Sequence, residues 1–483
     1  MKEIAGYLPP GFGDNLDYQT LSFQRNEESI QITIPLLSEN QISNLAAQIK
    51  NNSQRVLKLF TVNQIINIID QTIAVFLDRS SPFRQKAEKL LPVITGYDKE
   101  IIRLGLTSYL KSFRKPQLYR FLTEDFNNPM LLDEFQPRPK GGFSKAVGLD
   151  LLVHIWAGNV PALPLWSLIS GLIVKSGNIG KVSSNEPLFA GLFVKALVEV
   201  EPRLADCIAV IWWKGGDHAR ERSLWSQADG VIGYGSNQSL SSLREHIPIT
   251  TRFLPFGHKI SFGVVSKISL DSRKAIQTAH NAALDIVRYD QQGCYSPHFY
   301  FVQKGGRITP REYARMIGHE LACFEKRYPR QSLSLAEMTA NTAWRNREEL
   351  SIFLETSKEI MSDPSGKWAV VYEENTQEII PSCLNRVIKV VAIDDFEQIV
   401  DFVVPFRSLL QTVGLAASPQ ELFDISNILT KSGVTRITAL GSMTSPESGW
   451  HHDGRFNLLD LVNMVDIEQR AEEYAERFAP YVD

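Results

Sequence analysis

The sequence lacks the features that would assign it to a specialised class. Its four cysteines, Cys207, Cys294, Cys323 and Cys383, are scattered and form no Cys-x-x-Cys pair, which argues against a disulfide framework and a structural zinc site. Neither sign of charge is in excess, since 51 Lys and Arg oppose 54 Asp and Glu. A dedicated nucleic-acid-binding protein would be markedly basic, so we expect no nucleic-acid partner.

Long apolar runs and low-complexity tracts are also absent. The most apolar stretch, residues 151–174, is interrupted by Gly158, Pro161, Pro164 and Gly171, so it predicts a buried strand, turn and helix rather than a membrane span. The N-terminus lacks the apolar core of a signal peptide. Since 43% of residues are hydrophobic and 22% charged, we expect a globular cytoplasmic protein.

The order of apolar segments predicts an α/β fold. A length of 483 residues suggests two or three domains. The first third reads as mostly helical, with a short strand over residues 30–34 that Pro35 closes and a capping box at Ser38 and Gln41. Strand-length runs then alternate with helix-length segments, which is typical of parallel sheets. The expected strands are 151–156, 179–183, 207–213, 230–234, 260–265, 298–303, 367–374 and 386–393. Thr309 is expected to begin a helix, and residues 457–477 to form an amphipathic one.

Cys294 is the candidate nucleophile. It lies in a polar turn with a glycine, residues 291–297, between an expected helix and an expected strand. A thiol at such a junction can face a cleft, and its thiolate is a strong nucleophile when the pKa is lowered. The alternative is a small buried side chain, the usual fate of a cysteine outside disulfides. The other three cysteines lie in apolar patterns and are expected in the core.

Polar residues follow two of the expected strands. Asn159, in Gly-Asn-Val-Pro, offers an amide that suits a developing oxyanion, although a plain Gly-Asn turn explains it equally. Lys181, followed by Ser183 and Ser184, suits a ribose or phosphate, and its alternative is a solvated loop.

A third strand is followed by Gly233-Tyr234-Gly235-Ser236, a turn whose amides suit a pyrophosphate at a helix N-terminus. It is not a full G-x-G-x-x-G motif. The pair His451 and His452 suggests a metal or acid–base cluster, but no further ligand lies at a suitable spacing. We therefore expect a packing role for these histidines, and no metal.

Taken in this order, the motifs resemble the aldehyde dehydrogenase superfamily. The stretches HIWAGNVPALPLWSL, QQGCYSP and GWHHDGRFNLLDLV are similar to those of LuxC-type acyl-CoA reductases, the fatty-acyl reductases of bacterial bioluminescence operons, and the resemblance covers residues 140–465. It implies an aldehyde dehydrogenase-like fold. We expect a helical part over 1–140, a Rossmann-like cofactor domain over 141–265, a catalytic domain over 266–440, and a C-terminal loop and helix over 441–483.

The resemblance also implies a mechanism. Cys294 would attack an acyl thioester and expel coenzyme A, Asn159 and the Cys294 amide would stabilise the oxyanion, and a nicotinamide hydride would release the aldehyde. The residues that match cofactor-binding positions are Lys181, Ser183, Ser184, Gly233, Gly235 and Ser236. Trp156, Trp166 and Phe299 lie near the motifs and would line an acyl tunnel, although each also fits an ordinary core.

Two departures from the superfamily narrow the reaction. Aldehyde-oxidising members carry Leu-Glu-Leu-Gly-Gly-Lys, whose Glu activates water, and Pro255 stands in its place here. An acyl-enzyme without that base should wait for hydride or a thiol, as in a reductase. NAD-preferring members carry a Glu at the position of Ser184, so the neutral Ser184 favours NADPH. The carboxylate of the nearby Glu186 is an argument against NADPH.

Other functions stay open at this point. The same cysteine could serve an NAD(P)-dependent aldehyde or semialdehyde dehydrogenase, or a cofactor-independent acyltransferase or thioesterase. A lipid-binding protein without turnover is an alternative from another class. The resemblance further implies a fatty acyl-CoA substrate, an acyl-protein synthetase partner, for which the final helix is one docking face, and a homo-oligomer.

Overall fold

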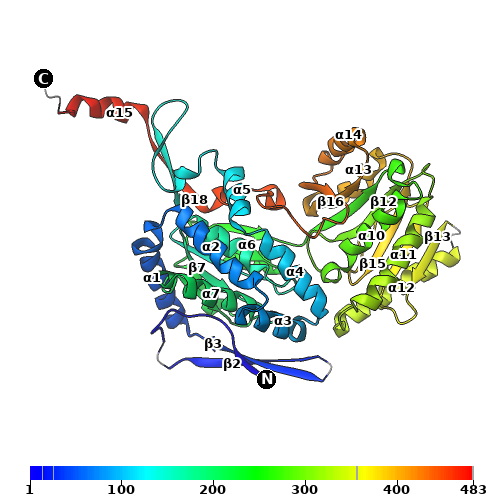
Figure 1. The fold of residues 1–483 in the computed structure, drawn as a ribbon, viewed down its shortest axis with the longest axis horizontal. Coiled ribbons are helices and arrows are strands. Elements are labelled where there is room, and N and C mark those ends of the chain that lie inside the picture. Colours follow the sequence, from blue (N-terminus) through cyan, green and yellow to red (C-terminus); the bar gives the residue numbers. More distant parts are fainter. Residues whose placement is uncertain (14, 26, 355–356, 481–483) are drawn as a thin grey trace. The chain divides into compact units, whose positions relative to one another are not determined.

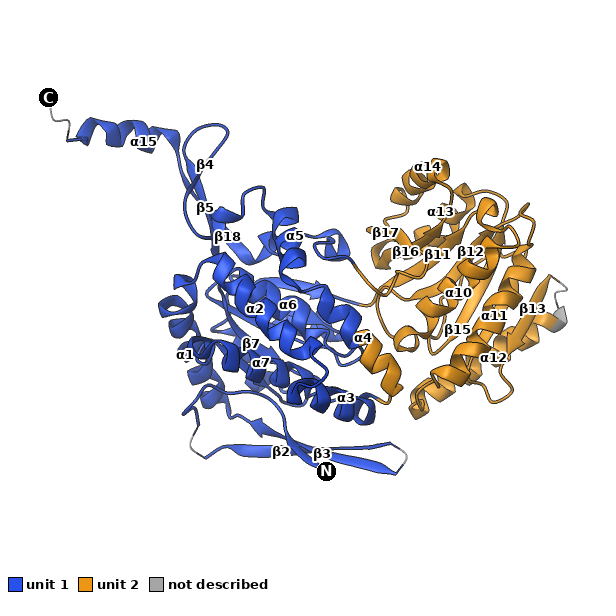
Figure 2. Cartoon of the chain, viewed as in Figure 1, with its two compact units in different colours: residues 1–95, 106–257, 447–483 blue, residues 96–105, 258–446 orange. Residues whose placement is uncertain are grey.

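A computed structural model describes residues 1–13, 15–25, 27–354 and 357–480. The chain forms two compact units, shown in different colours in Figure 2. Unit 1 contains residues 1–95, 106–257 and 447–483, and unit 2 contains residues 96–105 and 258–446. The chain passes from unit 1 to unit 2 between Gly257 and His258, before the expected end of the cofactor domain at residue 265.

Unit 1 is built on a five-stranded parallel sheet in the order β10-β9-β6-β7-β8, of which Figure 1 labels β7. Four of its strands lie where the apolar runs predict them, and their residues are buried almost throughout, as expected for a sheet covered on both faces. The strands are β6 (Leu151–Ile155), β7 (Gly177–Lys181), β8 (Ile208–Ile211), β9 (Gly230–Tyr234) and β10 (Arg252–Phe256).

Helices pack on this sheet through their apolar faces. In α1, the capping box of Ser38 and Gln41 is confirmed, and Ile42, Leu45 and Ile49 join the core with Val153 of β6. The helices that belong wholly to unit 1 are α1 (Glu39–Arg55), α2 (Val62–Leu77), α3 (Pro82–Thr95), α5 (Lys115–Asp125), α6 (Pro164–Ile173), α7 (Phe189–Val200), α8 (His218–Trp225), α9 (Asn237–His246) and α15 (Gln469–Ala475), while α4 (Lys99–Lys111) contributes to both units.

Two small sheets in unit 1 were not expected, although the strand predicted over residues 30–34 is confirmed within the first of them. The N-terminal sheet contains β1 (Lys2–Ile4), β3 (Glu28–Leu36) and β2 (Asp17–Arg25), so the first third is less helical than predicted. The second contains β18 (Val462–Ile467), β5 (Phe143–Gly148) and β4 (Gln136–Pro137). The predicted helix over 457–477 is wrong for its first part, because β18 pairs antiparallel with β5, more than 300 residues earlier in the chain, and is confirmed only over α15. Three of the six residues of β18 are β-branched and favour a strand once that partner is present.

Unit 2 contains a seven-stranded sheet in the order β13-β14-β15-β12-β11-β16-β17, parallel except for β13 at one edge. The strands are β11 (Ile260–Val265), β12 (Pro297–Gln303), β13 (Lys358–Ser362), β14 (Ala369–Glu373), β15 (Val387–Ile393), β16 (Leu410–Ala416) and β17 (Arg436–Ala439). The helices are α10 (Lys274–Val287), α11 (Pro310–Arg327), α12 (Leu335–Leu354), α13 (Glu397–Val403) and α14 (Pro419–Thr430). The expected capping box at Thr309 is confirmed at the start of α11.

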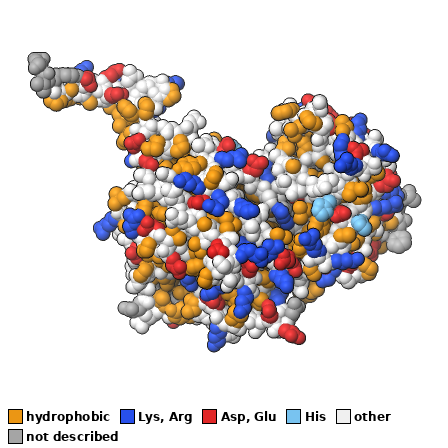
Figure 3. Space-filling view, viewed as in Figure 1, with side chains coloured by type: hydrophobic (Ala, Val, Ile, Leu, Met, Phe, Trp, Pro, Cys, Tyr) orange, Lys and Arg blue, Asp and Glu red, His pale blue; other side chains and the backbone are white. Residues whose placement is uncertain are grey.

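The surface carries both signs of charge. On the face in Figure 3, Lys and Arg lie interspersed with Asp and Glu and with apolar side chains, in keeping with the net charge of −3. Within the described ranges, no single helix is long and apolar enough to cross a membrane, and one pair of segments, Glu39–Leu59 and Val62–Leu77, passes by length and composition but is bent by 104°. No group of three or more His, Cys, Asp or Glu that could hold a metal ion occurs in the part of the chain that the structure describes.

Candidate active site

The candidate cofactor residues of unit 1 lie at one edge of its sheet. Strands β6, β7 and β9 are parallel, so their carboxyl ends share that edge, and Asn159, Lys181 and Gly235 lie at or directly after these ends. The chain runs from β6 to β7 and β8 on one side, then returns to β9 on the other. Such a reversal of strand order is where open α/β sheets bind their ligands.

Two loops touch at this edge. A Cβ added to Gly158 would lie 2.9 Å from Ser183 Oγ and 2.9 Å from the backbone nitrogen of Glu186. A larger residue would therefore push the loops apart, and the glycine keeps Asn159 close to the loop that follows Lys181. The ammonium of Lys181 lies 5.9 Å from the ring centre of Trp213, and burial lowers the pKa of Lys181.

The start of α9 supplies backbone N–H groups at the same edge. Ser236 is the N-cap of this helix, and its hydroxyl accepts a hydrogen bond from the Ser239 amide (3.1 Å). A Cβ at Gly235 would approach one side-chain atom at 3.7 Å, so the backbone there is open to a ligand. A helix N-terminus beside an open glycine suits a phosphate.

The structure gives Ser184 and Glu186 different environments. Ser184 is exposed, and its hydroxyl accepts a hydrogen bond from Trp212 Nε1 (3.1 Å). Glu186 is 4% exposed, and its Oε1 accepts from the amides of Leu188 (2.8 Å) and Phe189 (2.9 Å). Burial raises the pKa of Glu186. This carboxyl group therefore caps the start of α7, and the sequence could not distinguish that use from ribose binding.

The three candidate substrate-binding residues are buried. Trp156 lies against Gly180, where an added Cβ would meet its ring at 1.8 Å, and its Nε1 donates to Ser167 Oγ (2.9 Å). Trp166 donates to Asn457 Oδ1 (3.1 Å), and Phe299 belongs to the core of unit 2, where it stacks on Phe262. Each thus has a packing role, and acyl binding by any of them stays a prediction.

Unit 1 contains a stack of aromatic rings that could not be predicted from the sequence. The ring of His452 lies 4.4 Å from that of Phe256 and 4.9 Å from that of Trp450, and Phe256 stacks on Tyr234 at 5.0 Å. Phe256 and Tyr234 end strands β10 and β9. The packing role predicted for the histidine pair is therefore found at His452, which ties the C-terminal motif to the sheet.

Cys294 belongs to unit 2, at the amino edge of that sheet. It precedes β12, it is partly buried, and its carbonyl accepts a hydrogen bond from Ser261 Oγ (2.9 Å) on β11. All four cysteines lie in the described part of the chain, and none forms a disulfide.

Two of the other thiols are poorer candidates, and the expectation that all three lie in the core is wrong for Cys323. Burial raises the pKa of Cys207 to about 12 and that of Cys383 to about 11, so both are protonated at neutral pH. Cys323 is exposed on α11, and its Sγ lies 3.7 Å from His319 Nε2.

Two histidines accompany the cysteine in unit 2. His258 and His298 lie at the amino ends of β11 and β12, with ring centroids 5.9 Å apart. Burial lowers the pKa of His298 to about 4 and also lowers that of His258. At neutral pH both rings are uncharged.

Comparison with solved structures identifies the fold. The fold of the protein is similar to that of aldehyde dehydrogenases of known structure. Aldehyde dehydrogenase 21 from Physcomitrella patens matches with a TM-score of 0.74 at 11% identity, over 97% of this chain and 99% of that one. KauB from Pseudomonas aeruginosa matches with a TM-score of 0.74 at 12% identity, over 96% of each chain. The expected α/β fold, aldehyde dehydrogenase-like, is confirmed.

Sequence comparison then gives the family. The model of the acyl-CoA reductase (LuxC) family matches residues 57–464, so the chain belongs to this family of oxidoreductases. A relative from Photobacterium leiognathi, long-chain acyl-protein thioester reductase 2, is 25% identical over 91% of this chain and 88% of its own length. The long-chain acyl-protein thioester reductase of Photorhabdus luminescens is 23% identical over 96% of this chain and 92% of its own.

Proposed function

We propose that this protein reduces a long-chain fatty acyl thioester, with fatty acyl-CoA as donor, to the aldehyde through a thioester on Cys294. The observation that carries the proposal is the place of Cys294 in a fixed, partly buried loop of an acyl-CoA reductase family member. The thiols of Cys207 and Cys383 are unsuited to attack because burial raises their pKa values.

In the proposed first step, the Cys294 thiolate attacks the acyl carbonyl and the coenzyme A thiolate leaves. The Asn159 side-chain amide and the Cys294 backbone amide stabilise the tetrahedral oxyanion, which is the charge that develops in this step. In the second step, the thioester accepts two electrons as hydride, and the resulting thiohemiacetal collapses to the aldehyde and the Cys294 thiolate.

NADPH is the cofactor that we propose, and when bound it supplies the hydride. The residues fit a dinucleotide, since Lys181, Ser183 and the N-terminus of α9 with Gly233, Gly235 and Ser236 share the carboxyl edge of the unit 1 sheet. Ser184 is neutral and exposed, so it leaves room for a 2′-phosphate. Glu186 is a weaker argument against NADPH than the sequence suggests, because its buried carboxyl group accepts hydrogen bonds from backbone N–H groups at the start of α7.

The place of Pro255 supports reduction rather than aldehyde oxidation. Pro255 is exposed in β10, the edge strand of the sheet, where a missing N–H group is tolerated, and it pairs with Gly233. No carboxylate is available at this position to activate water. The acyl-enzyme would therefore persist until hydride reaches it. An acyl-protein donor, a synthetase partner and a homo-oligomer stay predictions from the resemblance, and a cytoplasmic location stays a prediction from the composition.

The experiment is to trap the intermediate. Wild type and Cys294→Ala are incubated with tetradecanoyl-CoA without nucleotide, digested, and examined by mass spectrometry for an acylated peptide. We expect one acyl group, on Cys294, and release of tetradecanal when NADPH is added. Rapid release of free tetradecanoic acid instead would indicate a thioesterase. If the wild type is not acylated by tetradecanoyl-CoA but is acylated by an acyl-protein, the donor is the acyl-protein and not fatty acyl-CoA.

A further inference from the structure

The turn that leads to Cys294 has an unusual backbone. Tyr289, Asp290 and Gln291 are three consecutive residues in the left-handed region, with φ of 51°, 49° and 64°. Non-glycine residues adopt this region at a cost in free energy, so such a run persists only where surrounding contacts impose it. A second left-handed run, Leu384–Arg386, precedes β15 in the same unit, with φ of 67°, 60° and 64°.

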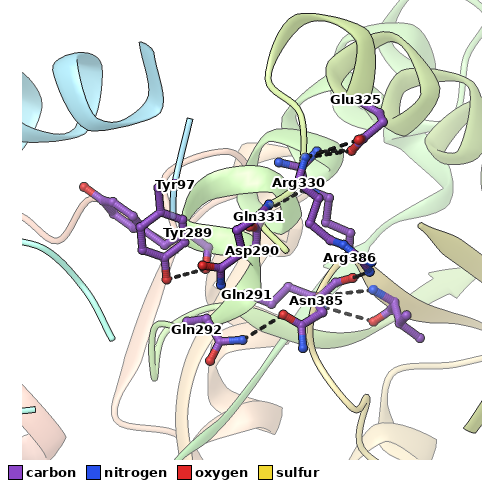
Figure 4. A network of polar contacts seen from close by, with 11 residues as sticks. Tyr97, Tyr289, Asp290, Gln291, Gln292, Glu325, Arg330, Gln331, Asn385 and Arg386 are labelled. Carbon is purple, nitrogen blue, oxygen red and sulfur yellow. Dashed lines mark hydrogen bonds and ion pairs between the residues drawn. The ribbon is translucent and has the colours of Figure 1, made fainter. Parts of the chain in front are cut away.

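The two left-handed runs are bonded to each other (Figure 4). The backbone N–H of Asn385 donates to the backbone carbonyl of Asp290 (3.0 Å), and Gln292 Nε2 donates to the Asn385 side-chain oxygen, Oδ1 (3.1 Å). Arg386 Nε donates to Asp290 Oδ1 (2.7 Å), and these two side chains are 1% and 2% exposed. A buried ion pair thus joins segments that are 96 residues apart.

Further contacts fix both sides of this pair. Arg386 also donates to Glu325 Oε2 of α11 (2.7 Å), and Arg330 donates to the Asn385 carbonyl (3.1 Å). The other carboxylate oxygen of Asp290 accepts from the Gln331 amide (3.3 Å). Asp290 and Arg386 therefore have little freedom to move relative to α11 and β15.

The constraint extends from the ion pair to the cysteine loop. Gln291 accepts from the Val387 amide (2.9 Å) and donates to the Pro297 carbonyl (2.8 Å), so its side chain closes the base of the loop 292–296. The carbonyl of Cys294, within this loop, is held by Ser261. The direction of Gln291 depends on the left-handed turn, which Asp290 and Arg386 hold.

We propose that the Asp290–Arg386 ion pair is a positioning element that fixes the Cys294 loop for attack on the acyl thioester. The proposal rests on the proposed function and adds two residues to it that touch neither substrate nor cofactor in that scheme. A fixed loop aligns the thiol with the carbonyl, and loss of that alignment lowers the rate of attack more than it weakens donor binding.

The test removes both charges together, because a single removal leaves an orphaned buried charge and risks unfolding. The test variant replaces both members of the Asp290–Arg386 ion pair, Asp290→Leu with Arg386→Met, and is called the clamp variant. The matched control is Glu348→Leu with Lys389→Met, a second buried pair of unit 2 (3.0 Å, 3% and 4% exposed). Glu373, which also contacts Lys389, keeps Lys358 as a partner in the control (2.7 Å). Melting temperatures report the folding of both variants.

Two rates of Cys294 are measured by mass spectrometry, acylation by tetradecanoyl-CoA and alkylation by iodoacetamide. We expect the clamp variant to lose at least tenfold in the maximal acylation rate, with the half-saturating donor concentration and the alkylation rate each within about threefold. The control should keep both rates within about twofold. Should the clamp variant fail to fold, Arg386→Lys replaces it, with a severalfold loss of acylation expected, because lysine keeps the charge but cannot bridge Asp290 and Glu325 as a planar guanidinium does.

Equal losses in clamp and control variants, or full acylation in the clamp variant, would overturn the positioning role while leaving the proposed function intact. Parallel loss of acylation and alkylation would also overturn it, because the thiol itself would then be impaired. A wild-type protein that is alkylated but never acylated would instead refute the proposed function, and the positioning role with it.

Discussion

The two units present their candidate residues at opposite edges of parallel sheets. In unit 1, Asn159, Lys181 and Ser236 follow the carboxyl ends of strands, where helix N-termini offer N–H groups to anions. In unit 2, Cys294 and Arg386 precede the amino ends of β12 and β15, and the helix before the cysteine, α10, ends at Val287. A helix C-terminus disfavours anions, so a site at this edge needs side chains to build it. Backbone and glycines suffice in unit 1, whereas unit 2 uses a buried network of charges and amides.

Apart from removal of the nucleophile itself, the largest expected effect separates the roles of the two units. Asn159→Ala removes the proposed side-chain donor to the oxyanion, and we expect kcat for reduction to fall about a hundredfold to a thousandfold. Alkylation of Cys294 by iodoacetamide should not change, since no oxyanion forms in that reaction. Steady-state kinetics and thiol alkylation measure both. A fall in alkylation, or an unchanged kcat, would contradict the division of roles.

Acid should destabilise unit 1 through His154. Burial lowers the pKa of this side chain from 6.5 to about 4, so the unfolded chain binds more protons than the folded protein between these values. The stability that neutral His154 provides is present above pH 6.5 and is lost as the pH falls toward 4.

We expect His154→Gln to reduce the loss of unfolding free energy between pH 7 and pH 5 by about 2 kcal/mol. Chemical denaturation at the two pH values measures it. An identical loss in wild type and variant would show that His154 titrates alike in both states.

A smaller effect tests the cofactor edge of unit 1. Ser184→Glu introduces a carboxylate beside the expected 2′-phosphate, and we expect the ratio of kcat/KM for NADPH to that for NADH to fall about tenfold, equivalent to about 1.4 kcal/mol of repulsion. Rates of Cys294 acylation without nucleotide serve as the control in unit 2 and should be unaffected. An unchanged cofactor ratio would place the 2′-phosphate elsewhere.

The smallest effect concerns Glu186. Because its carboxyl group caps α7, Glu186→Ala should cost about 1 kcal/mol of unfolding free energy, as for other helix caps, and leave the NADPH to NADH ratio unchanged. Thermal unfolding and the same cofactor kinetics measure the two outcomes. A shift in the NADPH to NADH ratio without loss of stability would indicate that Glu186 binds the cofactor ribose instead.

The candidate site of unit 1 could be predicted from sequence more fully than that of unit 2, although the strands of unit 1 could be predicted no more fully than those of unit 2. Strands β6, β7 and β9 and the polar residues after them follow from short apolar runs and their ends, which are local signals. The partnership of Asp290 with Arg386 joins residues 96 positions apart, and neither stands out in its own segment. The same limit explains the missed strand β18, whose partner β5 lies in a distant part of the chain. Glu186 could be identified as a candidate from the sequence, but only its hydrogen bonds distinguish a helix cap from a ribose ligand.

The most direct test of the account is NADPH oxidation by the purified protein with tetradecanoyl-CoA, measured beside Cys294→Ala. We predict steady oxidation with formation of tetradecanal in the wild type and loss of at least a thousandfold in the variant, because removal of a nucleophile leaves only binding and oxyanion contacts. Retention of most of the rate by Cys294→Ala would contradict the thioester mechanism. It would also remove the reason for the fixed loop in unit 2.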